Sequence, residues 1–121
     1  MSYEIRLSDD KSFVIVHVKK SLSPQTALVF TQESVELANK NNINSYLIDL
    51  REIGKHTWGV LETYQFAQEL KNYKRQRLDK VALLVEPDNK TFSFVETTTA
   101  NQGYNTRIFT NYDEAVVWLK G

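Results

Sequence analysis

Residues that could carry chemistry gather in one short segment near the middle of the chain. Charged side chains stand there beside an imidazole, a hydroxyl and an indole: Arg51, Glu52, Lys55, His56, Thr57 and Trp58. The segment precedes a predicted helix start, where unpaired backbone amides and the helix dipole favour a phosphate on a hydroxyl such as Thr57. The alternative is structural: Thr57 caps the helix, while His56 and Trp58 pack the loop onto the core.

Other candidate groups carry weaker signals. Asp49 and Glu52 could act as paired carboxylates, although an aspartate at a strand end more often orders the following loop. His17 stands in a β-branched run and is expected to be a hydrogen-bonded core histidine. Two histidines without H-x-x-x-H spacing, and no cysteine, do not support a metal site.

Catalytic and cofactor motifs are missing from the sequence. It contains no G-x-S-x-G elbow and no glycine-rich phosphate loop, so neither a serine hydrolase nor a nucleotide cofactor bound in that way is indicated. We therefore expect no cofactor and no catalytic activity. Were the chain an enzyme, His56, Asp49 and Arg51 would be the first residues to test.

Composition narrows the class of protein. The 121 residues suit one domain, 1–121, with 41% hydrophobic and 25% charged residues. Fifteen Lys and Arg balance fifteen Asp and Glu, which argues against a dedicated nucleic-acid binder. No apolar run reaches the ~20 residues of a membrane span, and the first residues do not resemble a secretory signal, so we expect a soluble, cytoplasmic protein.

Basic side chains cluster once along the chain. The cluster is Lys71, Lys74, Arg75, Arg77 and Lys80, with Tyr73 inside it. It could contact a polyanion, but we interpret it as the solvated end of a helix.

Hydrophobic patterning predicts an α/β domain with the order β-β-α-β-α-β-α-β-α. Strands are expected at 3–7, 13–18, 46–50, 81–85 and 106–109, and helices from Ser23-Pro24 to about Asn39, from Val60 to about Arg75, over 91–102 and from Asn111 onward. The segment 91–102 also fits a strand, but its place after a buried strand favours a crossover helix. Crossovers of this kind imply a mostly parallel, five-stranded mixed sheet, with the first strand antiparallel.

The element order and two motifs resemble STAS domains, the fold of anti-sigma-factor antagonists (SpoIIAA-like proteins). The first motif is the strand 47–50 with the loop and helix start that follow it, Ile53 to Leu61; the second is Arg107-Ile-Phe109 followed by the helix with Trp118 and Leu119. In that family, Asp-Ser-x-Gly in this loop carries the residue that a partner kinase phosphorylates. The resemblance places Thr57 at the phosphoacceptor position and Gly59 at the family glycine. His56 replaces the family's acidic residue, and Trp58 replaces a small one.

The resemblance implies a regulatory or protein-interaction module with an unidentified protein partner. Its binding loop would include Asp49, Arg51, His56, Trp58 and Gly59. The branch closest in pattern is STAS/CRAL-TRIO-like, which implies an alternative: a small apolar or lipid-like ligand beside the sheet.

Two further features leave the partners open. Several aromatic residues are expected near one sheet edge: Trp58, Tyr64, Phe66, Phe92 and Phe94. They could line a site for an apolar ligand, or they could pack in the hydrophobic core. An unpaired edge strand leaves a homodimer open as well.

Overall fold

The protein is described here from a computed structural model. The structure describes residues 3–19, 23–53, 65, 80–87 and 105–121. Their elements are β1 (Tyr3–Leu7), β2 (Val14–Val18), α1 (Pro24–Lys40), β3 (Ser45–Asp49), β4 (Lys80–Leu84), β5 (Asn105–Phe109) and α4 (Tyr112–Lys120). The helices predicted from Val60 and over 91–102 lie outside the described residues.

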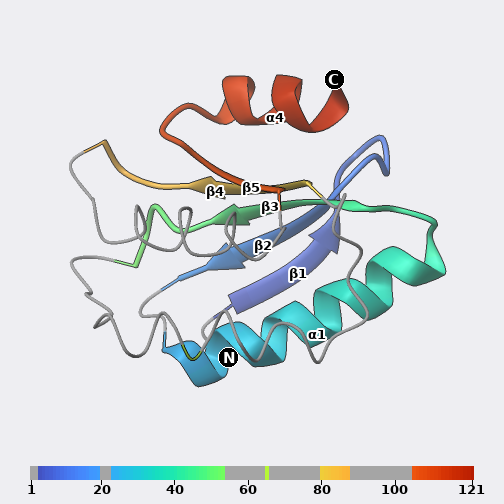
Figure 1. Ribbon diagram of the computed structural model, residues 1–121, viewed down its shortest axis with the longest axis horizontal. Coiled ribbons are helices and arrows are strands. Elements are labelled where there is room, and N and C mark those ends of the chain that lie inside the picture. The colour runs from blue at the N-terminus through green and yellow to red at the C-terminus, as the bar shows by residue number, and fades with distance from the viewer. Residues whose placement is uncertain (1–2, 20–22, 54–64, 66–79, 88–104) are drawn as a thin grey trace.

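The five strands form one sheet in the order β1-β2-β3-β4-β5. β1 pairs antiparallel with β2, and the other three pairs are parallel. The predicted mixed, mostly parallel sheet is therefore confirmed, with the antiparallel strand at one edge. Because β2, β3 and β4 run in the same direction, their carboxyl ends meet at the same end of the sheet (Figure 1).

The turn between β1 and β2 is built by short polar side chains. The Asp10 carboxylate accepts hydrogen bonds from the hydroxyls of Ser8 and Ser12, at 3.0 and 2.6 Å. Lys11 takes the left-handed conformation, with φ of 60°. The ammonium of Lys120, at the end of α4, also contacts Asp10, so the turn is tied to a helix far along the chain.

Helix α1 begins and ends where the sequence predicts. The Ser23 hydroxyl accepts a hydrogen bond from the Thr26 amide at 3.1 Å, and Pro24 opens the helix. After Lys40 the chain turns through Asn41 to Asn42, whose φ of 55° is one that asparagine tolerates better than most residues.

The two described helices lie on opposite faces of the sheet (Figure 1). Side chains that alternate along the strands divide the core accordingly. The cluster on the α1 face includes Val14, Val16, Tyr46, Val81 and Leu83 from the strands, with Ala27 and Phe30 from α1. The cluster on the α4 face includes Phe13, Ile15, Leu47, Ala82 and Leu84, with Ala115 and Leu119 from α4. Burial on both faces explains why β2, β3 and β4 read as continuous apolar runs.

Helix α4 is held at both ends. Asn111 accepts a hydrogen bond from the Glu114 amide at 3.0 Å, which confirms it as the N-cap. At the other end, the Lys80 ammonium donates to the carbonyl oxygens of Trp118 and Gly121, at 3.0 and 2.8 Å. Lys80 also lies over the Trp118 ring, 5.6 Å from its centre.

These Lys80 contacts correct the prediction that it lies at the solvated end of a helix. Lys80 is the first residue of β4 and is half-buried. The other members of the basic cluster, between Lys71 and Arg77, lie outside the described residues.

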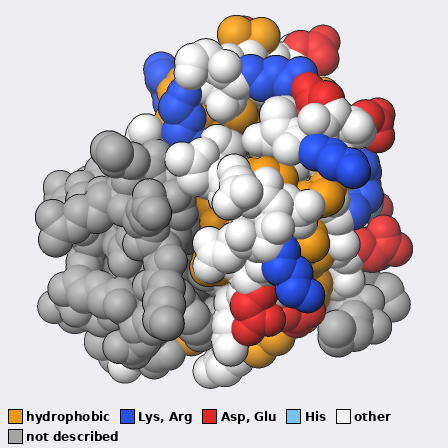
Figure 2. Space-filling view, turned by 90° about the vertical axis from the view of Figure 1, so that its right-hand side faces the viewer, with side chains coloured by type: hydrophobic (Ala, Val, Ile, Leu, Met, Phe, Trp, Pro, Cys, Tyr) orange, Lys and Arg blue, Asp and Glu red, His pale blue; other side chains and the backbone are white. Residues whose placement is uncertain are grey.

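Charges of both signs are mixed among the described residues on one face of the molecule. On the face that Figure 2 shows, Lys and Arg side chains are interspersed with Asp and Glu side chains. The described residues of this face thus form no large patch of one sign, and the expectation of no nucleic-acid partner stays a prediction.

Candidate functional site

The site begins where β2 and β3 end. His17 on β2 and Asp49 on β3 are partners in the parallel register, so their side chains leave the sheet on the same face. Their positions alternate with Val16 and Ile48, which pack on the α1 side, so both polar groups lie on the side of the sheet that α4 covers elsewhere. Ligands of open α/β sheets bind at such carboxyl ends.

Asp49 orders the start of the following loop. Its carboxylate accepts two parallel hydrogen bonds from the Arg51 side chain, from Nε at 3.0 Å and Nη2 at 2.9 Å. It also accepts a hydrogen bond from the Arg51 backbone amide at 3.1 Å. The prediction that Asp49 orders its loop is thus confirmed. A paired-carboxylate role has no support in this arrangement, because both Asp49 oxygens are occupied by Arg51.

The Asp49–Arg51 pair fixes the charge state of both groups. Partial burial alone would raise the pKa of the Asp49 carboxyl, but the hydrogen bonds from Arg51 outweigh burial and lower it. The hydrogen bonds to Asp49 raise the pKa of the Arg51 guanidinium, with smaller contributions from Glu86 and Glu52. Asp49 is therefore an anion at neutral pH and is unsuited to act as a general base.

His17 makes the second contact at this edge. Its Nε2 contacts the Glu52 carboxylate, although the two residues are 35 positions apart in the sequence. The His17 side chain is 32% exposed, so the prediction of a core histidine is wrong in its burial but right in its hydrogen bonding. His17 is the fourth of the five residues of β2, near the carboxyl end of that strand.

Together the two contacts anchor the first residues after β3. Arg51 is held to β3 through Asp49, Glu52 is held to β2 through His17, and Ile53 is buried in the core cluster on the α1 face. Contacts with β2, β3 and the core therefore hold the chain up to Ile53 at the carboxyl end of the sheet.

The remaining predicted site residues are not described by the structure. His56, Thr57, Trp58 and Gly59 lie outside the described residues, and so do the aromatic residues proposed to line an apolar site. The structure therefore brings together Asp49 and Arg51 among the predicted site residues. It adds His17 and Glu52, which the sequence analysis did not combine.

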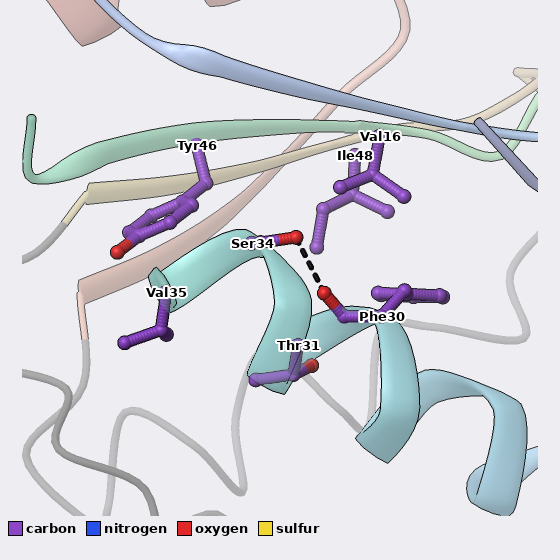
Figure 3. A pocket seen from close by; sticks show the side chains of 7 residues that line it. All are labelled: Val16, Phe30, Thr31, Ser34, Val35, Tyr46 and Ile48. Carbon is purple, nitrogen blue, oxygen red and sulfur yellow. Dashed lines mark hydrogen bonds between the residues drawn. The ribbon is translucent and has the colours of Figure 1, made fainter. Parts of the chain in front are cut away.

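A cavity lies between α1 and the sheet (Figure 3). It has a volume of about 10 Å³ and is lined by Val16, Phe30, Thr31, Ser34, Val35, Tyr46 and Ile48. The hydroxyls of Thr31 and Ser34 donate to carbonyl oxygens of α1 itself, at 2.6 and 2.5 Å. This space is barely enough for one water molecule and holds no lipid-sized ligand.

The described residues contain neither a cluster of metal-binding side chains nor a membrane-spanning helix. Among them, no group of three or more His, Cys, Asp or Glu side chains is arranged to hold a metal ion. No helix in this part of the chain is long and apolar enough to cross a membrane.

Comparison with solved structures identifies the architecture. An anti-sigma factor antagonist from Mycobacterium paratuberculosis matches over 99% of this chain and 96% of its own, with a TM-score of 0.60 and 11% identity. An uncharacterized protein of the DUF3478 family from Shewanella loihica PV-4, itself described as having a SpoIIAA-like fold, matches over 97% and 91%, with a TM-score of 0.54 and 20% identity. The fold is SpoIIAA-like.

The SpoIIAA-like fold confirms the resemblance drawn from element order and motifs. The likeness is one of structure: no protein-family model matches the sequence, and a search of curated proteins finds no match. At such low identities the shared fold carries no residue-level assignment, so the role of Thr57 stays a prediction.

The His17–Glu52 contact is the part of the site that sequence reasoning missed. One signal was available: His17 is the single polar residue in the run Val14–Val18, on the strand that pairs with β3. A polar side chain near the end of a buried strand is expected to need a partner. The identity of that partner could not be read from the sequence, because Glu52 belongs to a loop reached only after α1 and β3.

Proposed function

We propose that residues 1–121 form one non-enzymatic regulatory module that binds a protein partner. The observation that carries the proposal is the SpoIIAA-like fold, shared over nearly the whole chain with a protein described as an anti-sigma factor antagonist. The described residues support a binding role, because Arg51 is paired with Asp49 on β3 and Glu52 with His17 on β2, and these four groups are not arranged as an acid, a base and a nucleophile.

The proposed binding surface is the loop 51–59 at the carboxyl end of the sheet. The Asp49–Arg51 and His17–Glu52 contacts hold Arg51 and Glu52 in place at the start of this loop, which lowers the entropy that these two side chains lose when a partner binds. Asp49, Arg51, His56, Trp58 and Gly59 are the residues assigned to this surface. A segment that carries an aromatic residue and several charges at the end of a sheet suits recognition of a protein.

The proposed switch is phosphorylation of Thr57. A phosphate adds close to two negative charges and three acceptor oxygens, enough to change the fit of a partner to this edge. The support for Thr57 is its place in the sequence relative to the strand 47–50 and Gly59, as in the SpoIIAA-like proteins.

The test combines mapping of phosphate with partner capture. Tagged wild-type protein and the Thr57→Glu and Thr57→Val variants are isolated from cells that express the chain naturally, and the captured proteins are compared quantitatively by mass spectrometry. We expect a phosphate on Thr57 and at least one partner that binds wild type and Thr57→Val but not Thr57→Glu.

Thr110 provides a matched control. It is an exposed threonine just after β5, at the same end of the sheet, so Thr110→Glu adds the same charge outside the proposed surface. Capture that is unchanged by Thr57→Glu, together with an unmodified Thr57, would overturn the switch. Loss of the partner in Thr110→Glu as well would show a general charge effect and not a site.

A further inference from the structure

Strand β1 forms an edge of the sheet, and its outer side has no strand partner among the described residues. The Ser8 amide donates to the carbonyl of the directly opposite Phe13, at 2.9 Å, so this is a hydrogen-bonded pair. Such pairs alternate along an antiparallel ladder, so Arg6 and Glu4 also direct their backbone groups toward β2. The N–H and C=O groups of Tyr3, Ile5 and Leu7 consequently point outward.

The side chains of β1 are self-complementary in one arrangement. If a second β1 lies antiparallel to the first, with a two-fold axis at Ile5, then Glu4 stands opposite Arg6 of the second copy and Arg6 opposite its Glu4. These are non-hydrogen-bonded pairs, where side chains approach most closely, and opposite charges there stabilise the pairing. Tyr3 stands opposite Leu7 of the second copy, with hydrogen bonds between their backbones.

Neighbouring registers are disfavoured by charge. If the two-fold axis passes through Glu4, the two Glu4 carboxylates of the dimer stand opposite each other. If it passes through Arg6, the two Arg6 guanidinium groups stand opposite each other. A parallel, in-register pairing also opposes like charges at both positions. Like charges directly opposite one another destabilise a sheet, so the sequence of β1 selects a single register.

The apolar side of β1 supports the same arrangement. Ile5 and Leu7 are only partly buried against the core cluster on the α1 face, and a second copy would cover them further. Glu33 on α1 accepts the Tyr3 hydroxyl, which brings this side of the helix to the β1 edge. Val29 is one turn earlier on the same side of α1 and is 51% exposed, so an uncovered apolar side chain lies beside the edge.

The opposite edge of the sheet lacks this complementarity. Strand β5 carries one charged residue, Arg107, so no antiparallel pairing of two β5 strands can oppose unlike charges within the strand. The exposed charges of β1 would normally discourage edge pairing, but in the register centred on Ile5 they favour it.

We propose that β1 is a dimerisation edge, at which two copies of this chain join their sheets through antiparallel β1 strands related by a two-fold axis at Ile5. The partner is thus a second copy of the same chain, and the loop 51–59 is not needed for the contact. The proposal is independent of the function proposed above.

Charge exchange tests the register. Sedimentation velocity over a range of protein concentrations would be measured for wild type, Glu4→Arg, Arg6→Glu and the double variant with both changes. Each single change converts both symmetric pairs from attractive to repulsive, so we expect the dissociation constant of the dimer to rise roughly 10-fold or more. The double variant restores opposite charges and should return the constant to near the wild-type value.

Two controls separate the interface from other effects. Lys19 contacts Glu4 at 2.6 Å within one copy, so Lys19→Gln removes that ion pair without opposing like charges and should leave the dimer intact. Arg107→Glu changes the other edge and should also leave it intact. Circular dichroism confirms that each variant is folded.

The chain has no cysteine, which allows a direct geometric readout. Oxidation of Ile5→Cys should yield a disulfide-linked dimer, because paired Cα atoms at a two-fold axis lie about 5.5 Å apart. Leu7→Cys should not, since the two introduced thiols would be separated by about four residues of strand. A wild-type protein that is monomeric at every concentration, or a double variant that fails to restore the dimer, would overturn the proposal.

Discussion

The Arg51 guanidinium donates two parallel hydrogen bonds to the carboxylate of Asp49, only two residues earlier in the chain, at 3.0 and 2.9 Å. The same carboxylate accepts the Arg51 amide, so one side chain fixes both the backbone turn and the side chain that follows it. The Asp49 side chain is 14% exposed, which strengthens these charged hydrogen bonds relative to a pair in open water. These bonds therefore fix the position at which the loop leaves β3.

The first prediction concerns the pH dependence of this pair. The folded-state pKa of Asp49 is below that of a free aspartate, so its ionisation stabilises the folded state above a pH of about 4. The stabilisation is lost as the pH falls through the folded pKa. Asp49→Asn should lower the free energy of unfolding by about 1 kcal/mol at pH 7. Urea unfolding at pH 7 and at pH 3 should show the difference from wild type shrinking at the lower pH; a constant difference would contradict it.

The second prediction concerns Tyr3 at the edge of the sheet. Its hydroxyl donates to Glu33, and this hydrogen bond, with burial and the nearby negative charge, raises the pKa of Tyr3 to about 12. The unfolded chain loses this proton near pH 10 while the folded chain keeps it, so the contact stabilises the folded state below pH 10 and the benefit disappears toward pH 12. Tyr3→Phe should cost about 1 kcal/mol at pH 7.

Ultraviolet absorbance of tyrosinate offers the check on Tyr3. The difference in titration between wild type and Tyr3→Phe should show one tyrosine that ionises well above the ordinary range. A difference curve centred near pH 10 would mean that the Glu33 contact does not form in solution.

The third prediction concerns the N-cap of α4. Asn111→Ala removes the acceptor of the Glu114 amide and should lower the free energy of unfolding by about 1 kcal/mol. Asn111→Asp keeps an acceptor and adds a charge that suits a helix N-terminus, so it should retain wild-type stability. Thermal unfolding followed by circular dichroism distinguishes them, and equal losses in both variants would argue against capping.

The fourth prediction compares two positions on α4. Leu119 is buried against the sheet, whereas Val117 is 71% exposed. Leu119→Ala should cost about 2–5 kcal/mol, because it opens a space in the core cluster on the α4 face. Val117→Ala should change stability by less than about 0.5 kcal/mol. Chemical denaturation of both variants provides the measurement. A large loss of stability in Val117→Ala would contradict the exposed position of Val117.

Local signals made the boundaries of several elements predictable. Ser23-Pro24 marks the start of α1, Asn42 follows its end, and Asn111 starts α4, because caps depend on residues within one helical turn. The mostly parallel sheet with an antiparallel first strand was also predictable, since a hairpin followed by crossover connections allows few other strand directions.

Long-range contacts escaped prediction for a physical reason. The basic neighbours of Lys80 predict a helix end, yet its ammonium donates to carbonyl oxygens 38 and 41 residues later. The residues around Lys80 in the sequence give no sign that it contacts the end of α4. The two come together only when β4 pairs with β5 and α4 packs on the sheet. His17 and Glu52 illustrate the same limit across 35 residues.

The sequence by itself determined the α/β class, the antiparallel first strand, the helix caps and the role of Asp49 in ordering its loop. Each of these depends on neighbours along the chain or on the period of apolar residues. Only the tertiary structure decided that His17 pairs with Glu52, that Lys80 holds the end of α4, and that the outward groups of β1 belong to Tyr3, Ile5 and Leu7. Those relationships depend on strand register and on the packing of α4. Both are set only when segments far apart in the sequence come together.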